Sequence, residues 1–175
     1  AMVFSNQEAP SAQAVGALSA RAMDRARWLK LDGQRSALAL SSVARALGQP
    51  CFAGYDEHAQ VLLDIATSST AAWPGRDAAV DTLIEAHTMW PGAQPAILEA
   101  IDDEKTPWGY KLVLTGCCGE EGARRLEAML PRTKFEETRL RAKVQQTILR
   151  LADQVDVTSL LDPLYDGLRW DARAS

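Results

Sequence analysis

The chain has 175 residues, of which 47% are hydrophobic and 24% charged, and its formal net charge is −4. This length and composition allow one sizeable buried core, so a single globular domain is expected. The acidic balance argues against binding to nucleic acid or to an anionic membrane, because both require clustered lysines and arginines. No apolar run approaches the ~20 residues that cross a bilayer.

The cysteines and the first residues of the chain indicate a reducing compartment. Cys51, Cys117 and Cys118 are odd in number and the last two are adjacent, a pattern unlike a secreted disulfide framework. The first residues include Glu8 and Pro10, and they lack the basic start and apolar block of a signal peptide. We therefore expect a cytoplasmic protein; export by a route without a signal peptide would leave the same features.

A first helix is predicted after a flexible lead-in at residues 1–10. From Ser11 to about Leu31, apolar residues recur at spacings of three and four, which is the spacing of one helix face. The positions on this face are Val15, Leu18, Ala22, Ala26 and Leu29.

Two further helices precede a linker. Asp32 can cap the second helix, which Gly48 and the nearby Pro50 stop, and Asp56 can cap the third. The segment Ser68–Gly75 is rich in small residues and closes with Trp-Pro-Gly, so we expect a loop there.

The fourth and fifth helices are separated by a Pro-Gly break at Pro91. The fourth helix has the clearest periodic stripe in the chain, and Pro95 suits the first turn of the fifth. The residues on the stripe are Val80, Leu83, Ile84 and His87.

The segment Tyr110–Leu114 admits two interpretations. Thr106 followed by Pro107 is typical of a helix start, which makes the segment helical. Gly109, however, weakens a helix by about 1 kcal/mol relative to alanine, and apolar residues also alternate here as in a strand.

The last secure helix is predicted over residues 134–153. Thr133 and Glu136 have the spacing of a capping box ahead of a long apolar stripe. We expect one or two short helices after it, with Pro163 in a first turn or at a break, and a flexible tail at residues 171–175.

These elements together predict an all-α protein. An α/β fold needs several strands, and only one segment can be interpreted as a strand. We expect one domain over residues 11–170, built as an irregular right-handed helical bundle or as a stack of about 8–9 helices.

The middle of the chain, about residues 79–131, resembles HEAT-like α-helical repeats. A helix that ends in an acidic turn at Asp102 is followed by a proline-started helix, and a glycine-containing turn leads into the next helix. The resemblance implies stacked helix pairs that share a core and present a surface to a partner. The similar segments are Leu83–Ala86, Ile97–Ala100 and Leu126–Ala128.

A glycine pattern offers the alternative of an enzyme. The segment Gly116–Gly122 has the Gly-x-x-Gly-x-x-Gly spacing of dinucleotide-binding turns, in which a helix N-terminus holds a pyrophosphate. Glu120 and Glu121 would place two negative charges at that position. The other interpretation is a turn between two helices, with the acids favouring the start of the second.

Few residues in the chain could support cysteine catalysis or metal binding. Cys117 and Cys118 could be activated near a helix N-terminus, but a catalytic pair needs a histidine, and the chain has only His58 and His87. Both histidines lie on apolar stripes, which favours interior positions, and no metal-ligand spacing is present. We therefore predict no catalytic, cofactor-binding or metal-ligating residue.

The sequence favours a protein-protein interaction or scaffold domain, such as an effector, an immunity-type protein or an assembly factor, that binds another protein. Tryptophan is enriched at binding hot spots, and Trp73 and Trp90 stand at Trp-Pro breaks where partial exposure is expected. Basic residues on the first helix could dock an acidic partner. The candidate partner-binding residues are Trp73, Trp90, Trp108, Arg21, Arg25 and Arg27.

Overall fold

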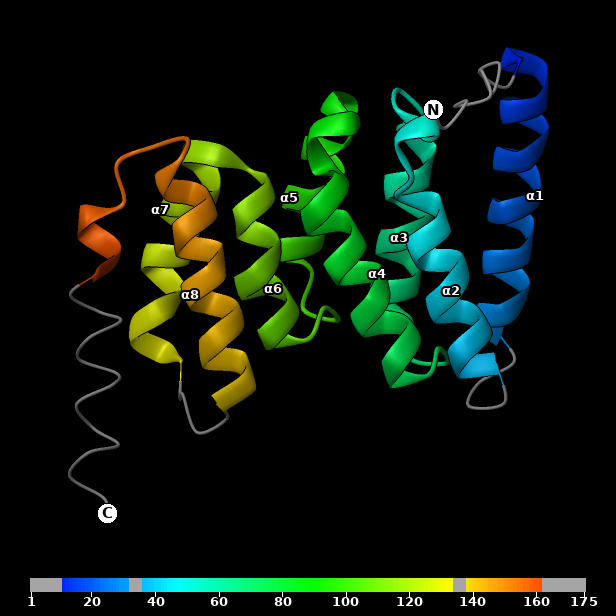
Figure 1. Ribbon diagram of the computed structural model, residues 1–175. Helices are drawn as coiled ribbons and strands as arrows, with labels where there is room; N and C mark the ends of the chain where they lie inside the picture. Colours follow the sequence, from blue (N-terminus) through cyan, green and yellow to red (C-terminus); the bar gives the residue numbers. More distant parts are fainter. Residues whose placement is uncertain (1–10, 32–35, 134–137, 162–175) are drawn as a thin grey trace, which may run out of the picture.

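The structure, a computed structural model, describes residues 11–31, 36–133 and 138–161 (Figure 1). Every regular element in these ranges is a helix, so the all-α prediction is confirmed. Several predictions lie outside the described residues. They concern the lead-in at residues 1–10, the Asp32 cap, Glu136 of the capping box, and the segment from residue 162 onward, including Pro163.

The α-helices alternate with short 3₁₀ turns. The α-helices are α1 (Ala12–Leu31), α2 (Ala37–Leu47), α3 (Glu57–Thr67), α4 (Trp73–Ala86), α5 (Gln94–Asp102), α6 (Trp108–Leu114), α7 (Gly119–Met129) and α8 (Thr138–Ala152). The 3₁₀ turns are η2 (Pro50–Phe52), η3 (His87–Met89), η4 (Pro91–Ala93), η5 (Thr115–Cys117) and η6 (Leu130–Arg132).

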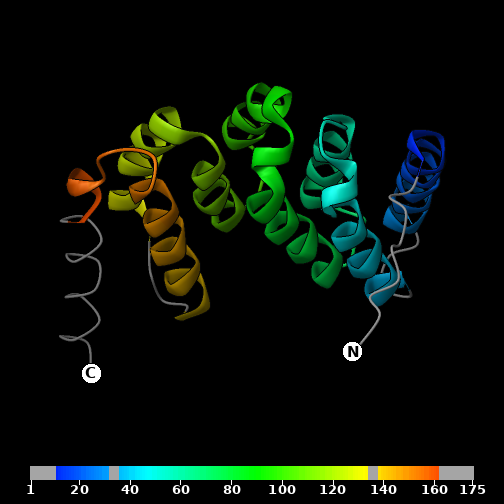
Figure 2. The ribbon, with the colours of Figure 1, turned by 45° about the horizontal axis from the view of Figure 1, so that its top comes forward.

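The helices form a gently curved stack in which α1 lies at one end and α7 and α8 lie towards the other (Figures 1 and 2). Helices α2, α4, α6 and α8 contact one another in sequence along one side, and α1, α3 and α5 do so along the other. Figure 2 shows α7 continuing the second row. Neighbours along a row are therefore two helices apart in the chain.

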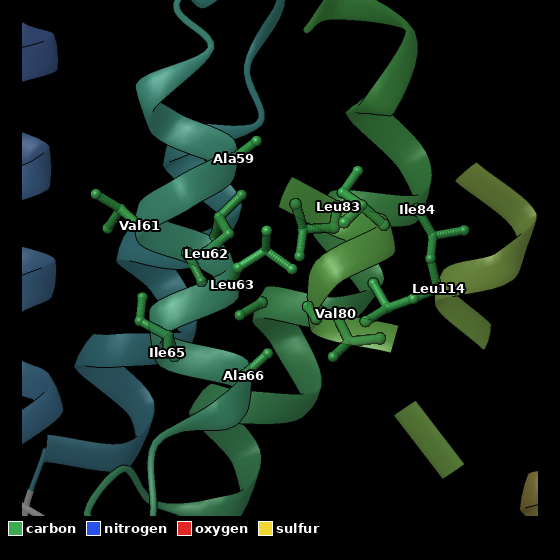
Figure 3. Packing of buried hydrophobic residues seen from close by; sticks show 14 of the residues in the cluster. Ala59, Val61, Leu62, Leu63, Ile65, Ala66, Val80, Leu83, Ile84 and Leu114 are labelled. Carbon is green, nitrogen blue, oxygen red and sulfur yellow. The ribbon is translucent and has the colours of Figure 1, made fainter. Parts of the chain in front are cut away.

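Two adjacent hydrophobic clusters fill the space between the rows. The larger cluster extends from α1 to the turn after α6, and the smaller joins α6, α7, α8 and Leu160. Figure 3 shows Leu62 and Leu63 of α3 pointing towards Leu83 of α4, whereas Val61 points the other way, towards α1. Helix α6 contributes Leu112 to the smaller cluster and its next two residues to the larger, so it connects the two.

The predicted face of α1 is wrong at one position. Leu18 is 57% exposed, whereas the neighbouring Ser19 is buried. Ser19 lies 2.6 Å from the Nε2 atom of His58, which is itself buried. The hydrogen bond makes burial of the serine favourable, and apolar periodicity alone does not reveal it.

Two predicted helix starts are displaced by a few residues. Helix α4 begins at Trp73, with Pro74 in its first turn, so the Trp-Pro-Gly sequence opens a helix instead of closing the linker. Helix α6 begins at Trp108 with Pro107 at the N-cap position, so Thr106 lies one residue before the cap. Pro95 does occupy the first turn of α5, as expected.

Candidate interaction surfaces

The glycine turn joins two helices and has no strand before it. Tyr110–Leu114 is part of α6, so the strand interpretation, on which the dinucleotide site depended, is wrong. The turn continues as η5, and α7 begins at Gly119. Hydrogen bonds from Arg124 and Arg125 lower the pKa of Glu121 to about 2. An ionised carboxylate at this helix start repels a phosphate.

Steric constraints explain why each of the three positions in the turn is occupied by glycine. Gly119 has φ +53°, a left-handed conformation that L residues rarely adopt. A Cβ atom at Gly122 would overlap the carbonyl oxygen of Thr115, and one at Gly116 would lie 3.1 Å from the Cγ2 atom of Thr147. Gly116 and Gly122 therefore serve the close packing of α8 and α7 on the turn, and Gly119 serves its left-handed backbone.

The adjacent cysteines are interior residues. Cys117 and Cys118 are both buried, and burial raises the pKa of Cys117 above its ordinary value and that of Cys118 to about 12. Their thiols lie 3.9 Å and 4.0 Å from the carbonyl oxygens of Leu83 and Leu114. A thiol needs a lowered pKa to act as a nucleophile, so the burial of both thiols opposes activation at the helix N-terminus.

The histidines are separate from the cysteines. His58 is fully buried, and its Nδ1 atom lies 3.1 Å from the carbonyl oxygen of Leu47. The carbonyl can only accept, so Nδ1 carries the hydrogen and Nε2 accepts from Ser19. His87 hydrogen-bonds to the carbonyl oxygen of Ile84 at 2.9 Å. Within the described ranges, no group of three or more His, Cys, Asp or Glu side chains could hold a metal ion.

Trp90 contradicts the expectation of exposure. It is 1% exposed, and its ring lies 6.4 Å from that of His58, between α4 and α5. Its Nε1 atom donates to the carbonyl oxygen of Phe52 at 3.4 Å. A partner cannot reach this side chain, so Trp90 is removed from the candidate binding residues.

Trp73 and Trp108 are the first residues of α4 and α6. Helices α4, α6 and α8 begin at the lower edge of the stack in Figure 1, which we call the helix-start edge. Trp73 is 57% exposed and Trp108 is 41% exposed. The guanidinium carbon of Arg139 lies 4.6 Å from the ring centre of Trp73, and Trp108 donates to the hydroxyl of Thr133 at 3.2 Å. Both rings are exposed and held in place by neighbours on or beside α8.

An ionic network connects the helix-start edge to a groove between α4 and α8. Asp77 is buried and pairs with Arg139 and with Lys143, whose Nζ atom is 3.0 Å away. Lys143 also contacts Asp81 at 2.8 Å. These residues were not predicted from the sequence, although an acidic pair and a basic pair, each four residues apart on one helix, were the available signal.

The groove beside this network is small and charged. Its volume is about 190 Å³, and residues from α4, α6 and α8 line it. The acidic side chains stand on the α4 wall and the basic ones on the α8 wall, an arrangement that suits polar contacts with a protein segment better than a single small anion. The charged lining residues are Asp81, Glu85, Lys143 and Arg150.

The three candidate arginines of α1 do not form one patch. Arg21 and Arg25 are exposed and four residues apart, on one side of the helix. Arg27 points to another side, where its guanidinium lies 3.5 Å from the carboxylate of Asp24. Arg25 instead contacts the ring of Trp28, with 4.8 Å from its guanidinium carbon to the ring centre.

Comparisons with known proteins identify no family for this chain. No family model, curated protein or solved structure matches it. Among the residues that the structure describes, none of the helices is both long and apolar enough to cross a membrane.

Proposed function

We propose that this chain is a non-enzymatic protein-binding or scaffold domain, built as a HEAT-like stack, and that it binds another protein along the helix-start edge. Support for the HEAT-like part comes from the two rows of helices, in which row neighbours are two helices apart in the chain. Such stacks present extended surfaces to partners.

The observation that carries the proposal is the pair of exposed, oriented tryptophans. An exposed indole normally has many rotamers, and fixing them costs binding free energy. Trp73 is already held against Arg139, and Trp108 against Thr133. Rings that are exposed and pre-oriented have the properties of hot-spot anchors.

The enzymatic alternative depended on a nucleotide-binding glycine turn and on reactive cysteines, and the geometry of the turn favours neither. The Gly116–Gly122 turn packs against Thr147, and its adjacent cysteines are buried with raised pKa values. No other observation in the described residues favours a nucleotide-dependent or cysteine-dependent reaction.

The test is affinity capture from cells that naturally produce the protein, with quantitative mass spectrometry. The wild-type chain is compared with the double variant Trp73→Ala/Trp108→Ala and with Leu149→Ala, which removes a side chain 68% exposed on α8. We expect at least one protein that wild type and Leu149→Ala retain equally. The double variant should lose it by a factor of about 10 or more, since each hot-spot truncation costs over 1 kcal/mol.

Two results would reject the proposal. One is that no captured protein distinguishes the double variant from wild type, although circular dichroism shows both to be equally helical. The other is a rise in melting temperature on adding nicotinamide or adenine nucleotides, because only a bound ligand stabilises the folded state in this way.

A further inference from the structure

The end of the stack formed by α1 has an unusual surface. Helix α1 contacts α2 and α3 with one face, and it is the outermost helix at this end (Figures 1 and 2). The terminal helix of a stacked protein normally has a polar outer face, which keeps the end from associating.

The exposed face of α1 carries large apolar residues instead. Leu18, Trp28 and Leu31 are 57%, 56% and 71% exposed. Together with Arg21 and Arg25 they follow one another at spacings of three, four, three and three, so the five residues form one stripe along the helix. We call this the α1 stripe; its spacing is that by which a helix packs on another helix.

The positive charge of α1 indicates that its partner is acidic. Helix α1 has four basic residues and one acidic residue, a net charge of +3 in a chain whose total is −4. The acidic residue, Asp24, is paired with Arg27 outside the stripe. Neither Arg21 nor Arg25 has an ion pair with any described residue, so both are available to carboxylates.

We propose that the α1 stripe binds an amphipathic acidic helix of a partner protein, which continues the stack beyond α1. Leucine-type side chains of that helix would pack beside Leu18 and Trp28, and its flanking glutamates would pair with Arg21 and Arg25. This second surface rests on the proposed function only in that the domain acts by binding; the helix-start edge and α1 bind independently.

Other occupants fit the stripe less well. Two α1 helices from two copies of the chain would bring like charges of +3 together, which opposes pairing. An anionic membrane would have to attract a chain with net charge −4. Two arginines flanked on both sides by apolar residues along one helix also suit a facing helix better than a flat lipid surface.

The test uses the full chain and a fluorescein-labelled peptide with the length of α1, 20 residues. The peptide has leucines at heptad spacing and glutamates beside them; a control peptide has lysines in place of the glutamates. Fluorescence anisotropy should show that the acidic peptide binds at least about 10-fold more tightly than the basic one, and less tightly as salt is raised.

Charge reversal supplies the decisive control. The variant Arg21→Glu/Arg25→Glu should reverse the preference, so that the lysine peptide binds about 10-fold more tightly than the acidic one. Trp28→Ala should weaken binding of both peptides. Trp73→Ala/Trp108→Ala should leave peptide binding unchanged, which separates this inference from the proposed function. Circular dichroism verifies that each variant is folded.

Three outcomes would overturn the inference. The first is equal affinity for the two peptides, or a preference that survives the charge reversal. The second is a dimeric mass for the wild-type chain that becomes monomeric in Arg21→Glu/Arg25→Glu, which assigns the stripe to a second copy. The third is flotation with phosphatidylserine vesicles that the same variant loses, without selective binding of the acidic peptide.

Discussion

Trp73 and Trp90 each precede a proline at a break between helical segments, yet their environments are opposite. Trp73 begins α4 on the helix-start edge and is 57% exposed. Trp90 lies in the connection between α4 and α5, and is 1% exposed beside His58 and Phe52. The Trp-Pro dipeptide therefore marks a break between helical segments in both places, but it does not determine whether the tryptophan is buried.

The difference between the two tryptophans comes from their neighbours. Near Trp90, α3 supplies the imidazole of His58 and the preceding turn supplies the carbonyl oxygen of Phe52, so the indole is enclosed and its donor is satisfied. Near Trp73, only Arg139 contacts one side of the ring among the described aromatic and cationic pairs. Trp90 is therefore positioned to stabilise the fold, whereas Trp73 is exposed, as its proposed role in binding requires.

The largest expected effect separates these two roles. Trp90→Ala should lower the free energy of unfolding by about 3–5 kcal/mol, since a buried indole is lost and a cavity remains. Trp73→Ala should lower it by less than about 1 kcal/mol, the value of an exposed cation–π contact. Urea denaturation followed by circular dichroism measures both; equal losses would remove the distinction.

The glycine turn offers a similar contrast, between a glycine packed against backbone and a glycine required by its left-handed conformation. Gly122→Ala should cost about 3 kcal/mol, because the new methyl group meets the backbone of Thr115, which cannot move without shifting η5. Gly119→Ala should cost about 1–2 kcal/mol, the cost of a left-handed conformation alone. The same denaturation assay applies. A Gly122→Ala loss no larger than that of Gly119→Ala would show that the turn is loosely packed.

The ionic network gives a smaller contrast between buried and exposed positions. Asp77→Asn should cost about 1–2 kcal/mol, because the new amide group places donors against Arg139 and Lys143 in a buried position. Asp81→Asn, at a side chain 47% exposed, should cost less than about 0.5 kcal/mol. Thermal unfolding at low and at high salt measures the pair, and similar costs would mean that water reaches Asp77 freely.

Sequence periodicity predicted where helices form, but it did not predict which side chains are buried or paired with other segments. Apolar spacing and proline signals located α1 and α5, because these depend on residues close in the chain. The burial of Trp90 and the pairing of Asp77 with Lys143 depend on segments that meet only after folding. The exposure of Leu18 follows the same rule, since hydrogen bonding with His58 of another helix keeps Ser19 inside.

The smallest expected effect concerns the imidazole beside Trp90. Burial lowers the pKa of His58 below its ordinary value of 6.5. The unfolded chain then binds a proton at a higher pH than the folded chain does, so the neutral imidazole stabilises the fold fully above pH 6.5. That stability is lost progressively as the pH falls from 6.5 through the lower pKa of the folded state. Protonation would also give Nε2 a hydrogen, which its neighbour Ser19 can accept only by rotating its own hydroxyl away.

The variant His58→Gln isolates this contribution. Glutamine can still donate towards Leu47 and accept from Ser19, but it does not titrate. Urea denaturation at several pH values between 5 and 8 should show a decline in the stability of wild type below pH 6.5 that is weaker in the variant, while carboxylates contribute equally to both. Parallel pH profiles would mean that His58 is hydrated in solution. The enclosed environment that distinguishes Trp90 from Trp73 would then be open to water as well, since the His58 and Trp90 rings pack against each other.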